Sequence, residues 1–343
     1  MKYAKIILYN LLAIILILAL FEGLMSLLIS NPALLARCPR KIQNSVGYLY
    51  SAGGRRVIQF MPACAQYDRE LGYTLKPGSC TFSGVEFNNG YRINSLGVRD
   101  DEKSLDHPEI VVAGDSVAMG WGVNQEETFA KLLEKKTSRT VLNAAVSSYG
   151  TAREMMILRR IPTGRLKTLI IQYSGNDYDE NRALYLHNNM LPTMSAEDYR
   201  HYTAINTQPN DYYFGKNLRL KWEKIIAERK NKKQEHGKES KPLDKDDVDL
   251  FLNAVSHSSI DVSRVRIIAF IVNGRDPADN RDFTQALKRK ISSGNYPPSI
   301  KNMIILDTAA ILRADHFYVL DDHPNRTGHE ALATALLDAV GKR

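Results

Sequence analysis

Four short polar motifs stand where acyl-transfer chemistry would need them, and the first carries a serine. Gly114-Asp115-Ser116 directly follows an apolar run, so a tight glycine turn would expose the Ser116 hydroxyl as a nucleophile. The backbone N–H of the same serine could face a developing oxyanion. Taken alone the tripeptide is weak evidence, because a serine at such a position often does no more than cap a helix.

Two further motifs could supply hydrogen bonds to an oxyanion. The turn Asn143–Gly150 is rich in small residues, and its backbone N–H groups could reach a bound carbonyl. The segment Ser174–Asp177 contains Asn176, whose side-chain amide could give another. Such a donor typically contributes a factor of about 10² to 10³ in rate. By itself, Asn176 would be interpreted as a turn residue before a helix.

The fourth motif spans 321–325, reads Asp-Asp-His-Pro-Asn and could supply a general base. His323 stands in a loop before the last predicted helix, and Asp321 two residues earlier could fix the tautomer of its imidazole. Asp322 is an alternative for the same role. The Asp-His pair at 315–316 has the same residue types but lacks the following turn and helix start, so we rank it lower.

The motifs fall at the ends of apolar runs that alternate with helical periodicity. Strands that are apolar throughout, separated by amphipathic helices, indicate a parallel sheet covered on both faces. Functional residues of such sheets gather at the carboxyl ends of the strands, where these motifs lie. The predicted strands are Ile110–Ala113, Val141–Val146, Thr168–Tyr173, Val265–Val272 and Met303–Leu306, and the predicted helices are Glu126–Lys136, Ala152–Arg160, Ala278–Ser292 and Asn325–Val340.

A long insertion at about 180–261 interrupts this alternation. It begins with a part rich in Tyr and Asn, continues through a basic helix around Lys216–Lys233 and ends in a polar linker near Gln234–Asp247. Loops of this length in compact domains are usually functional or disordered. We therefore expect a partly mobile lid over the active-site face, with a poorly ordered linker.

Together, and in family order, the four motifs resemble the signature blocks of the SGNH/GDSL hydrolases. The resemblance covers about Leu71–Asn181 and Ile304–Ala339 and leaves the insertion out. It implies an α/β fold, a flavodoxin-like three-layer α/β/α sandwich with a parallel sheet of about five strands. It also implies ester hydrolysis or acyl transfer without a metal or other cofactor. Similarity to the membrane-anchored bacterial branch of the family lies in 72–77, 93–100, 114–123 and 127–129.

Carried over from this resemblance, Ser116 is the nucleophile, His323 the base and Asp321 its orienting partner. Asn176 and the Ser116 backbone N–H would form the oxyanion hole, with a second-block donor at Ser148 or Gly150. Two departures from the family stand out. The final block reads Asp-x-His where Asp-x-x-His is usual, and the expected second-block glycine aligns with Ser148, which would require an ordinary φ there.

The first 30 residues predict a membrane anchor. Ile6–Ile29 is interrupted only by Asn10, Glu22, Gly23 and Ser26 and, as a helix, would reach about 36 Å, enough to cross a bilayer. No clean small-x-small cleavage site follows it, so we expect an uncleaved, single-pass signal anchor. An extension at 31–106, with short strands packing on the catalytic domain, would follow, and a catalytic domain at 107–343.

The three cysteines favour an extracytoplasmic position for the body. Cys38, Cys64 and Cys80 all precede the predicted catalytic domain. A disulfide between Cys64 and Cys80 would indicate an oxidising compartment, and three reduced thiols are the alternative. Basic residues flank both ends of the apolar helix, so the positive-inside rule gives only a weak orientation.

The formal net charge of +8 is concentrated in one segment. Lys216–Lys245 carries eleven Lys/Arg against five Asp/Glu, a local excess of six. A solvated helix face explains this charge, and contact with anionic lipid or an acidic polymer is the alternative. No interleaved aromatic residues or nucleic-acid motif accompany it, so we expect no nucleic-acid partner.

The residues allow three functions. The first is an esterase or deacylase that acts on O-acyl groups of an envelope polysaccharide or on lipid-derived esters. The second is an O-acyltransferase that uses the same nucleophile with a sugar hydroxyl as acceptor. The third is a non-catalytic scaffold that binds carbohydrate or partners, for which the tyrosines of the insertion would suit sugar rings.

Overall fold

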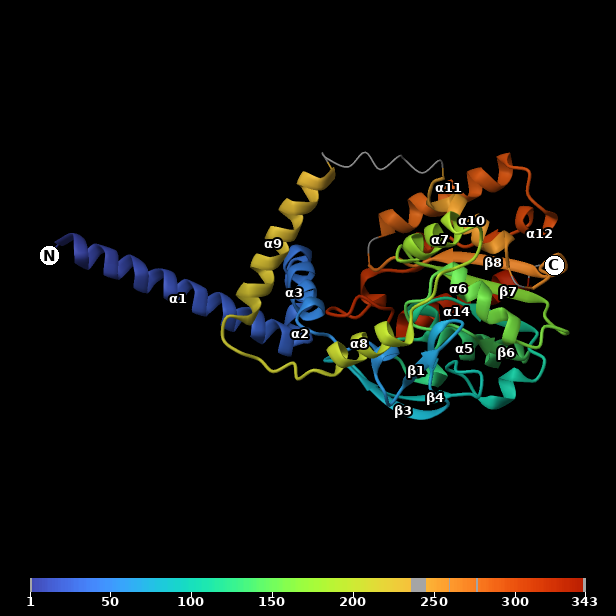
Figure 1. Ribbon diagram of the computed structural model, residues 1–343, viewed down its shortest axis with the longest axis horizontal. Helices are drawn as coiled ribbons and strands as arrows, with labels where there is room; N and C mark the ends of the chain where they lie inside the picture. Colours follow the sequence, from blue (N-terminus) through green and yellow to red (C-terminus); the bar gives the residue numbers. More distant parts are fainter. Residues whose placement is uncertain (1, 236–244, 259, 276, 342–343) are drawn as a thin grey trace. The chain divides into compact units, whose positions relative to one another are not determined.

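The computed structural model describes residues 2–235, 245–258, 260–275 and 277–341 (Figure 1). The chain forms two compact units. Unit 1 contains 1–55, 208–243 and 319–321, and unit 2 contains 56–207, 244–318 and 322–343. Each unit has a hydrophobic core of its own.

Unit 2 is built on a five-stranded sheet in which every neighbouring pair is parallel. The strand order is β6-β5-β7-β8-β9, which is the doubly wound order 2-1-3-4-5 of flavodoxin-like folds. Two predicted strands are confirmed residue for residue and the other three are shorter than predicted. The strands are β5 (Ile110–Ala113), β6 (Val141–Asn143), β7 (Thr168–Tyr173), β8 (Arg266–Ile271) and β9 (Ile304–Ile305).

Helices cover both faces of this sheet, as the apolar strands predict. Successive residues of β5 alternate between two cores: Ile110 and Val112 pack with α5 and α14, while Val111 and Ala113 pack with α6, α10 and α11. The result is a three-layer α/β/α fold (Figure 1). The helices of unit 2 are α4 (Ser116–Met119), α5 (Phe129–Thr137), α6 (Thr151–Ile157), α7 (Asp177–Leu186), α8 (Ala196–Thr207), α10 (Asp247–Ser256), α11 (Pro277–Ser293), α12 (Pro298–Lys301), α13 (Thr308–Ile311) and α14 (Arg326–Gly341).

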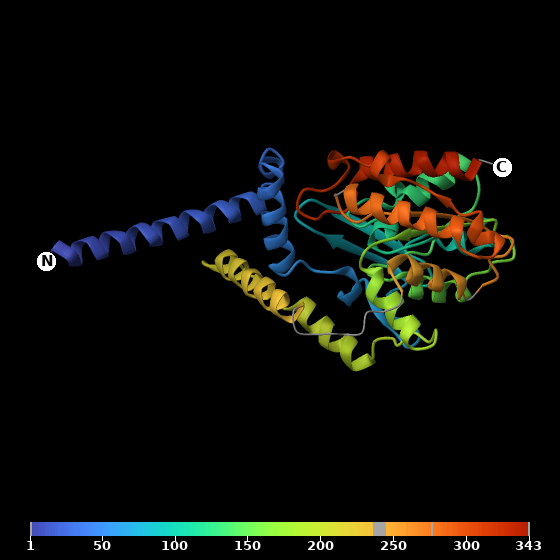
Figure 2. The same cartoon turned by 90° about the horizontal axis from the view of Figure 1, so that it is seen from above.

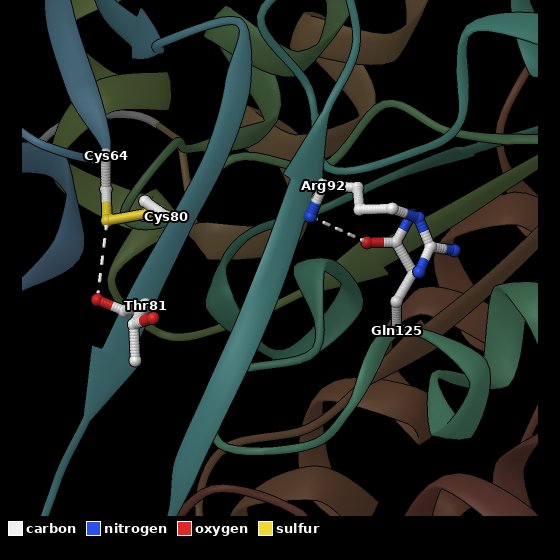
Figure 3. The surroundings of a disulfide bond; sticks show 5 residues. All are labelled: Cys64, Cys80, Thr81, Arg92 and Gln125. Carbon is white, nitrogen blue, oxygen red and sulfur yellow. Dashed lines mark hydrogen bonds between the residues drawn. A yellow bond between two sulfur atoms is a disulfide. The ribbon is translucent and has the colours of Figure 1, made fainter.

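Two antiparallel hairpins precede the sheet. They are β1 (Ala65–Asp68) with β2 (Gly72–Leu75), and β3 (Gly78–Ser83) with β4 (Asn88–Ile93). A disulfide between Cys64 and Cys80 joins the two, with the Cα atoms 5.4 Å apart (Figure 3). The structure thus contains the predicted disulfide and not three reduced thiols. Cys38 is a free cysteine.

Unit 1 contains the apolar N-terminal helix. It is made of α1 (Lys2–Ser30), α2 (Pro32–Leu35), α3 (Arg40–Ala52) and α9 (Lys216–Glu235). Figure 2 shows α1 as one continuous helix. The segment Tyr3–Ser30 has a mean hydropathy of 2.7 and is long and apolar enough to cross a membrane, by length and composition.

One face near the end of α1 packs against the rest of unit 1. Side chains from Tyr3 to Leu18 are all exposed, whereas Glu22, Met25 and Leu28 are buried. These three positions are three residues apart, which keeps them on the same side of a helix. The apolar helix therefore has an exposed first part and a packed last part.

Hydrogen bonds to Glu22 connect α9 to α1. Its carboxylate is fully buried and accepts hydrogen bonds from the backbone N–H and side-chain amide of Asn217 and from the backbone N–H of Leu218, each at 3.1 Å. These N–H groups belong to the first turn of α9, where the helix leaves them unused and its dipole favours a negative charge. A carboxylate inside an apolar helix is therefore satisfied by the end of another helix.

The insertion at 180–261 divides between the two units. In α8, Tyr199 and Tyr202 pack against Phe60 in unit 2. The basic helix α9 instead packs against α1 and α3 in unit 1. The lid over the active-site face stays a prediction. Most of the predicted linker at Gln234–Asp247 lies outside the described residues.

The packing of α6 buries Glu154, and this generates a prediction for stability. Burial, followed by the nearby Asp177 and Asp115, holds the pKa of Glu154 well above its usual range. Neither of its carboxyl oxygens has a hydrogen-bond partner among the described residues. The folded chain therefore keeps a proton that the unfolded chain releases above about pH 4.3, so this contribution to stability is lost as pH rises through the folded-state pKa.

Glu154→Gln removes the ionisation and keeps the shape of the protonated acid. We expect its melting temperature to exceed that of the wild type by about 2–4 °C at pH 8 and to equal it near pH 4. Scanning fluorimetry across this pH range measures both values. Glu197→Gln, an exposed position on α8, serves as the control and should shift neither value. A variant that melts below the wild type at pH 8 would contradict the prediction.

Candidate active site

The turn that carries Ser116 is held by two side chains. Asp115 caps α4 by accepting a hydrogen bond from the backbone N–H of Val117 at 2.8 Å. From β7, the side-chain oxygen of Gln172 accepts from the backbone N–H groups of Asp115 at 3.1 Å and Ala118 at 3.2 Å. Gln172 is fully buried, so these bonds are shielded from water. The serine therefore stands on a rigid junction between β5 and α4.

Close approach explains the glycine before this turn. A Cβ atom at Gly114 would lie 2.5 Å from the Cβ atom of Ala118 and 2.8 Å from the side-chain oxygen of Gln172. Both neighbours are buried, so no space exists for a larger residue. The first residue of the Gly-Asp-Ser motif is thus required by packing against Gln172.

The structure brings together Ser116 and His323, which are 207 positions apart in the chain. Ser116 Oγ lies 2.8 Å from His323 Nε2, within hydrogen-bond distance. The loop of His323 is closed by a bond from the backbone N–H of Tyr318 to the His323 carbonyl, at 2.9 Å, and by a bridge between Phe317 and Pro324. A serine hydroxyl beside an imidazole nitrogen is the arrangement that a nucleophile and its general base require.

Trp121 stacks on the imidazole of His323. The ring centroids are 4.8 Å apart and the planes differ by 13°. Trp121 is buried and is itself held by an edge contact with Phe82, at 4.5 Å between centroids. The indole therefore fixes the plane of the imidazole. The sequence showed Trp121 only as part of a longer similar stretch, because ring stacking between residues 202 positions apart leaves no sequence signal.

The two aspartates beside His323 have different surroundings. Asp321 is buried, and its Oδ1 forms an ion pair with Arg55 Nη1 at 2.8 Å. Asp322 is 55% exposed at its side chain and pairs with Arg275 Nε at 3.0 Å. Its φ of 61° lies in the left-handed region, which short polar side chains tolerate. Sequence reasoning found neither arginine, and the role of Asp321 toward His323 stays a prediction.

The lower-ranked pair at 315–316 has local partners. Asp315 forms an ion pair with Arg313, at 3.1 Å. The ring nitrogen Nδ1 of His316 accepts from the backbone N–H of Arg313 at 3.3 Å. These bonds cap a short 3-10 turn, which is a structural role.

The candidate oxyanion donors follow β6 and β7. Asn176 is exposed and immediately precedes α7. Ser148 is also exposed, and its φ is 59°. The expectation of an ordinary φ at this serine is therefore wrong: the turn keeps the left-handed backbone that a glycine would adopt freely. The Gly150 N–H donates to Glu180 Oε1 at 3.1 Å, so Gly150 is already engaged.

Two side chains from the segment before the sheet hold the Ser148 turn. Gln59 donates from Nε2 to Ser148 Oγ and accepts from Ser147 Oγ, each at 3.0 Å. Tyr73 donates its hydroxyl to the Ser147 carbonyl at 2.9 Å. Sequence reasoning missed both residues. Their bonds stabilise the unusual backbone at Ser148.

The described residues contain no group of three His, Cys, Asp or Glu side chains placed to hold a metal ion. Asp115, the acid next to Ser116 in the chain, is buried. Burial raises the pKa of Asp115, although its bond from Val117 N–H and the proximity of His323 act against that rise.

Known structures were compared with the chain. No protein-family model matches the sequence, and no curated protein matches it significantly. The structure is similar to a lipolytic protein of the G-D-S-L family from Desulfitobacterium hafniense DCB-2, at 12% identity and a TM-score of 0.37, over 67% of this chain and 97% of that one. It is similar to TesA at 12% identity and a TM-score of 0.34, over 68% and 97%. It is also similar to a carbohydrate esterase, at 13% identity and a TM-score of 0.33, over 69% of each chain.

The Trp121 stack generates a prediction for catalysis. Trp121→Ala frees the imidazole plane of His323, so we expect kcat on an activated ester to fall by about tenfold or more while KM changes little. Trp121→Phe keeps a flat ring and should recover most of the loss. Steady-state kinetics with circular dichroism as a fold check measure this. An equal loss in both variants, with intact fold, would show that stacking does not position the base.

A second prediction separates the two aspartates. If Asp321 orients His323, Asp321→Asn lowers kcat by about 10² to 10⁴-fold through the wrong tautomer. Asp322→Asn, at the exposed neighbour, should change kcat by no more than about threefold. The pH–rate profile of each variant adds a readout that loss of the Arg55 ion pair alone would not move. The reverse ranking would assign the role to Asp322.

Proposed function

We propose that the protein is a serine esterase that forms an acyl-enzyme on Ser116. The observation that carries this proposal is the 2.8 Å contact between Ser116 Oγ and His323 Nε2. An alcohol becomes a useful nucleophile near neutral pH when a base removes its proton as it attacks. The buried turn around Ser116 and the stacked ring of Trp121 support this role, because they hold both partners in one geometry before substrate arrives.

In the proposed reaction, Ser116 Oγ attacks the ester carbonyl and His323 Nε2 takes the hydroxyl proton. His323 then returns this proton to the departing alcohol, which leaves an acyl group on Ser116. Water, deprotonated by the same imidazole, releases the acid and restores the serine. One proton passes through the same nitrogen in each half of the cycle: the serine proton goes to the alcohol, and then a water proton goes to Ser116 Oγ.

The oxyanion of each tetrahedral intermediate needs donors. As the first residue of α4, Ser116 has a backbone N–H that the helix itself does not use. We assign the second donor to the side-chain amide of Asn176 and the third to the backbone N–H of Ser148. Gly150 is not included, because Glu180 accepts from its N–H.

We assign α1 the role of a single-pass anchor with the catalytic unit on the extracytoplasmic side. The Cys64–Cys80 disulfide supports this side, since such bonds persist in oxidising compartments. The proposed substrates are acyl esters found near that membrane, either O-acyl groups of an envelope polysaccharide or lipid-derived esters. The basic helix α9 supports contact with an anionic surface, and part of the 216–245 segment lies outside the described residues.

The test uses an active-site probe and a simple ester. We expect a fluorophosphonate to label the wild type and to fail with Ser116→Ala and His323→Ala. Both variants should lose at least about 10³-fold in kcat on a short-chain nitrophenyl ester. Ser195→Ala, at the exposed start of α8, is the matched control and should behave as the wild type.

The outcomes separate the three functions. Labelling and hydrolysis together support the esterase. Labelling with turnover only after a sugar acceptor is added would replace it with an acyltransferase. A folded wild type that neither labels nor hydrolyses would leave the non-catalytic scaffold.

A further inference from the structure

Unit 1 contains an apolar groove at the packed end of the anchor helix. Its volume is about 480 Å³, which falls in the range of sites that hold small ligands. Side chains from all four helices of the unit contribute to it. The groove is lined by Phe21, Leu24, Met25, Leu28, Leu34, Cys38, Lys41, Ile42, Ser45, Leu49 and Lys221.

The walls of the groove are fixed by the packing of unit 1. Glu22 holds the first turn of α9 against α1 through three hydrogen bonds. Leu35, Val46 and Leu220 belong to the buried core of the same unit. The groove is thus a surface feature of a packed helical cluster and is not a gap between loosely placed helices.

Several lining side chains present apolar surface outward. Leu24 is 51% exposed, and Leu34 and Ile42 are 37% and 38% exposed. Contiguous apolar surface of this kind marks an interaction site in proteins. Along α1, the groove residues follow the exposed apolar side chains of Tyr3–Leu18. Bilayer lipid would surround those side chains.

The charge at the groove selects the kind of occupant. Among the residues that the structure describes, the charged ones that line it are Lys41 and Lys221, and both are positive. An acyl chain fits the apolar wall, and a phosphate pairs with the two ammonium groups. A second copy of this chain fits poorly, because a symmetric contact would bring like charges face to face.

We propose that this groove binds one acyl chain of an anionic phospholipid, whose phosphate pairs with Lys41 and Lys221. The inference rests on the proposed role of α1 as a membrane anchor and goes beyond the esterase pair of Ser116 and His323, which lies in the other unit. The lipid fills the space between α1, α3 and α9. It becomes part of the structure of unit 1 in the membrane.

The test places the full-length protein in nanodiscs of phosphatidylcholine that carry a trace of photoactivatable lipid. The diazirine is on the acyl chain, and the headgroup is either phosphatidylglycerol or phosphatidylcholine. Mass spectrometry of the cross-linked peptides locates the chain. We expect cross-links at residues 21–28 and 42–49, with about tenfold more from phosphatidylglycerol, since each lysine favours an anionic headgroup.

Charge reversal supplies a matched pair of variants. Lys41→Glu combined with Lys221→Glu should bring the phosphatidylglycerol yield down to the phosphatidylcholine level. Arg40→Glu combined with Arg229→Glu makes the same change in charge on the same two helices, at exposed positions outside the groove, and should leave the yield unchanged. Ser45→Trp fills the groove and should remove the cross-links, with circular dichroism as a check of folding.

Native mass spectrometry of the protein released from the nanodiscs identifies the molecule bound in the groove. An adduct with the mass of phosphatidylglycerol supports the proposal. A fatty-acid adduct, a dimer cross-linked through 42–49, or equal yields from both headgroups would overturn it. A chain that nanodiscs fail to retain would refute the anchor, whereas a retained chain cross-linked only at residues 3–20 refutes the groove and leaves the anchor intact.

Discussion

The buried amide of Gln172 fixes the junction on which the proposed chemistry depends. It lies in β7 beside β5, and the parallel register of these strands pairs Val112 with Ile170 and Ala113 with Ile171. That register brings the Gln172 oxygen to the two N–H groups that flank Ser116 in the turn. Because side chains alternate along a strand, a slip of one residue would turn Gln172 to the opposite face. The position of the nucleophile is therefore set by strand pairing.

The chemistry of the junction also depends on which buried acids hold a proton. Glu154, Asp177 and Asp115 all lie near the carboxyl end of the sheet, and burial raises the pKa of each. Negative charge here would oppose the oxyanion that the proposed reaction forms at Ser116, since Coulomb interactions are strong in a buried setting. A raised pKa shifts each acid toward its neutral form and so reduces this opposition. The hydrophobic packing of α6 and α7 thus contributes to the electrostatics of the site.

Features that depend on the local pattern of apolar and polar residues could be predicted from the sequence alone. The strands at Ile110–Ala113 and Thr168–Tyr173 are apolar runs with sharp ends, and the structure places both as predicted. Ser116 and His323 could be paired in advance because each follows a strand or precedes a helix in a fixed order. Parallel sheets bring such positions to one edge.

Features that depend on contacts between distant side chains could not be predicted. Nothing in the residues around Asp321 points to Arg55, and the support that Gln59 gives to Ser148 crosses 89 positions of chain. The left-handed backbone at Ser148 was expected to exclude serine, and the fold overrides that preference with hydrogen bonds. The packing of the basic helix α9 on α1 could not be predicted either, because it depends on hydrogen bonds to a single glutamate inside an apolar run.

That glutamate sets an order of events in the making of the protein. The groups that satisfy Glu22 are 195 and 196 residues farther along the chain, so they do not exist when α1 is first synthesised. During early biogenesis the carboxylate must remain hydrated or protonated, because an unpaired charge is costly in an apolar setting. Only after α9 has been made can the end of α1 take its final packing. The final packing of α1 is therefore reached only when most of the chain has been translated.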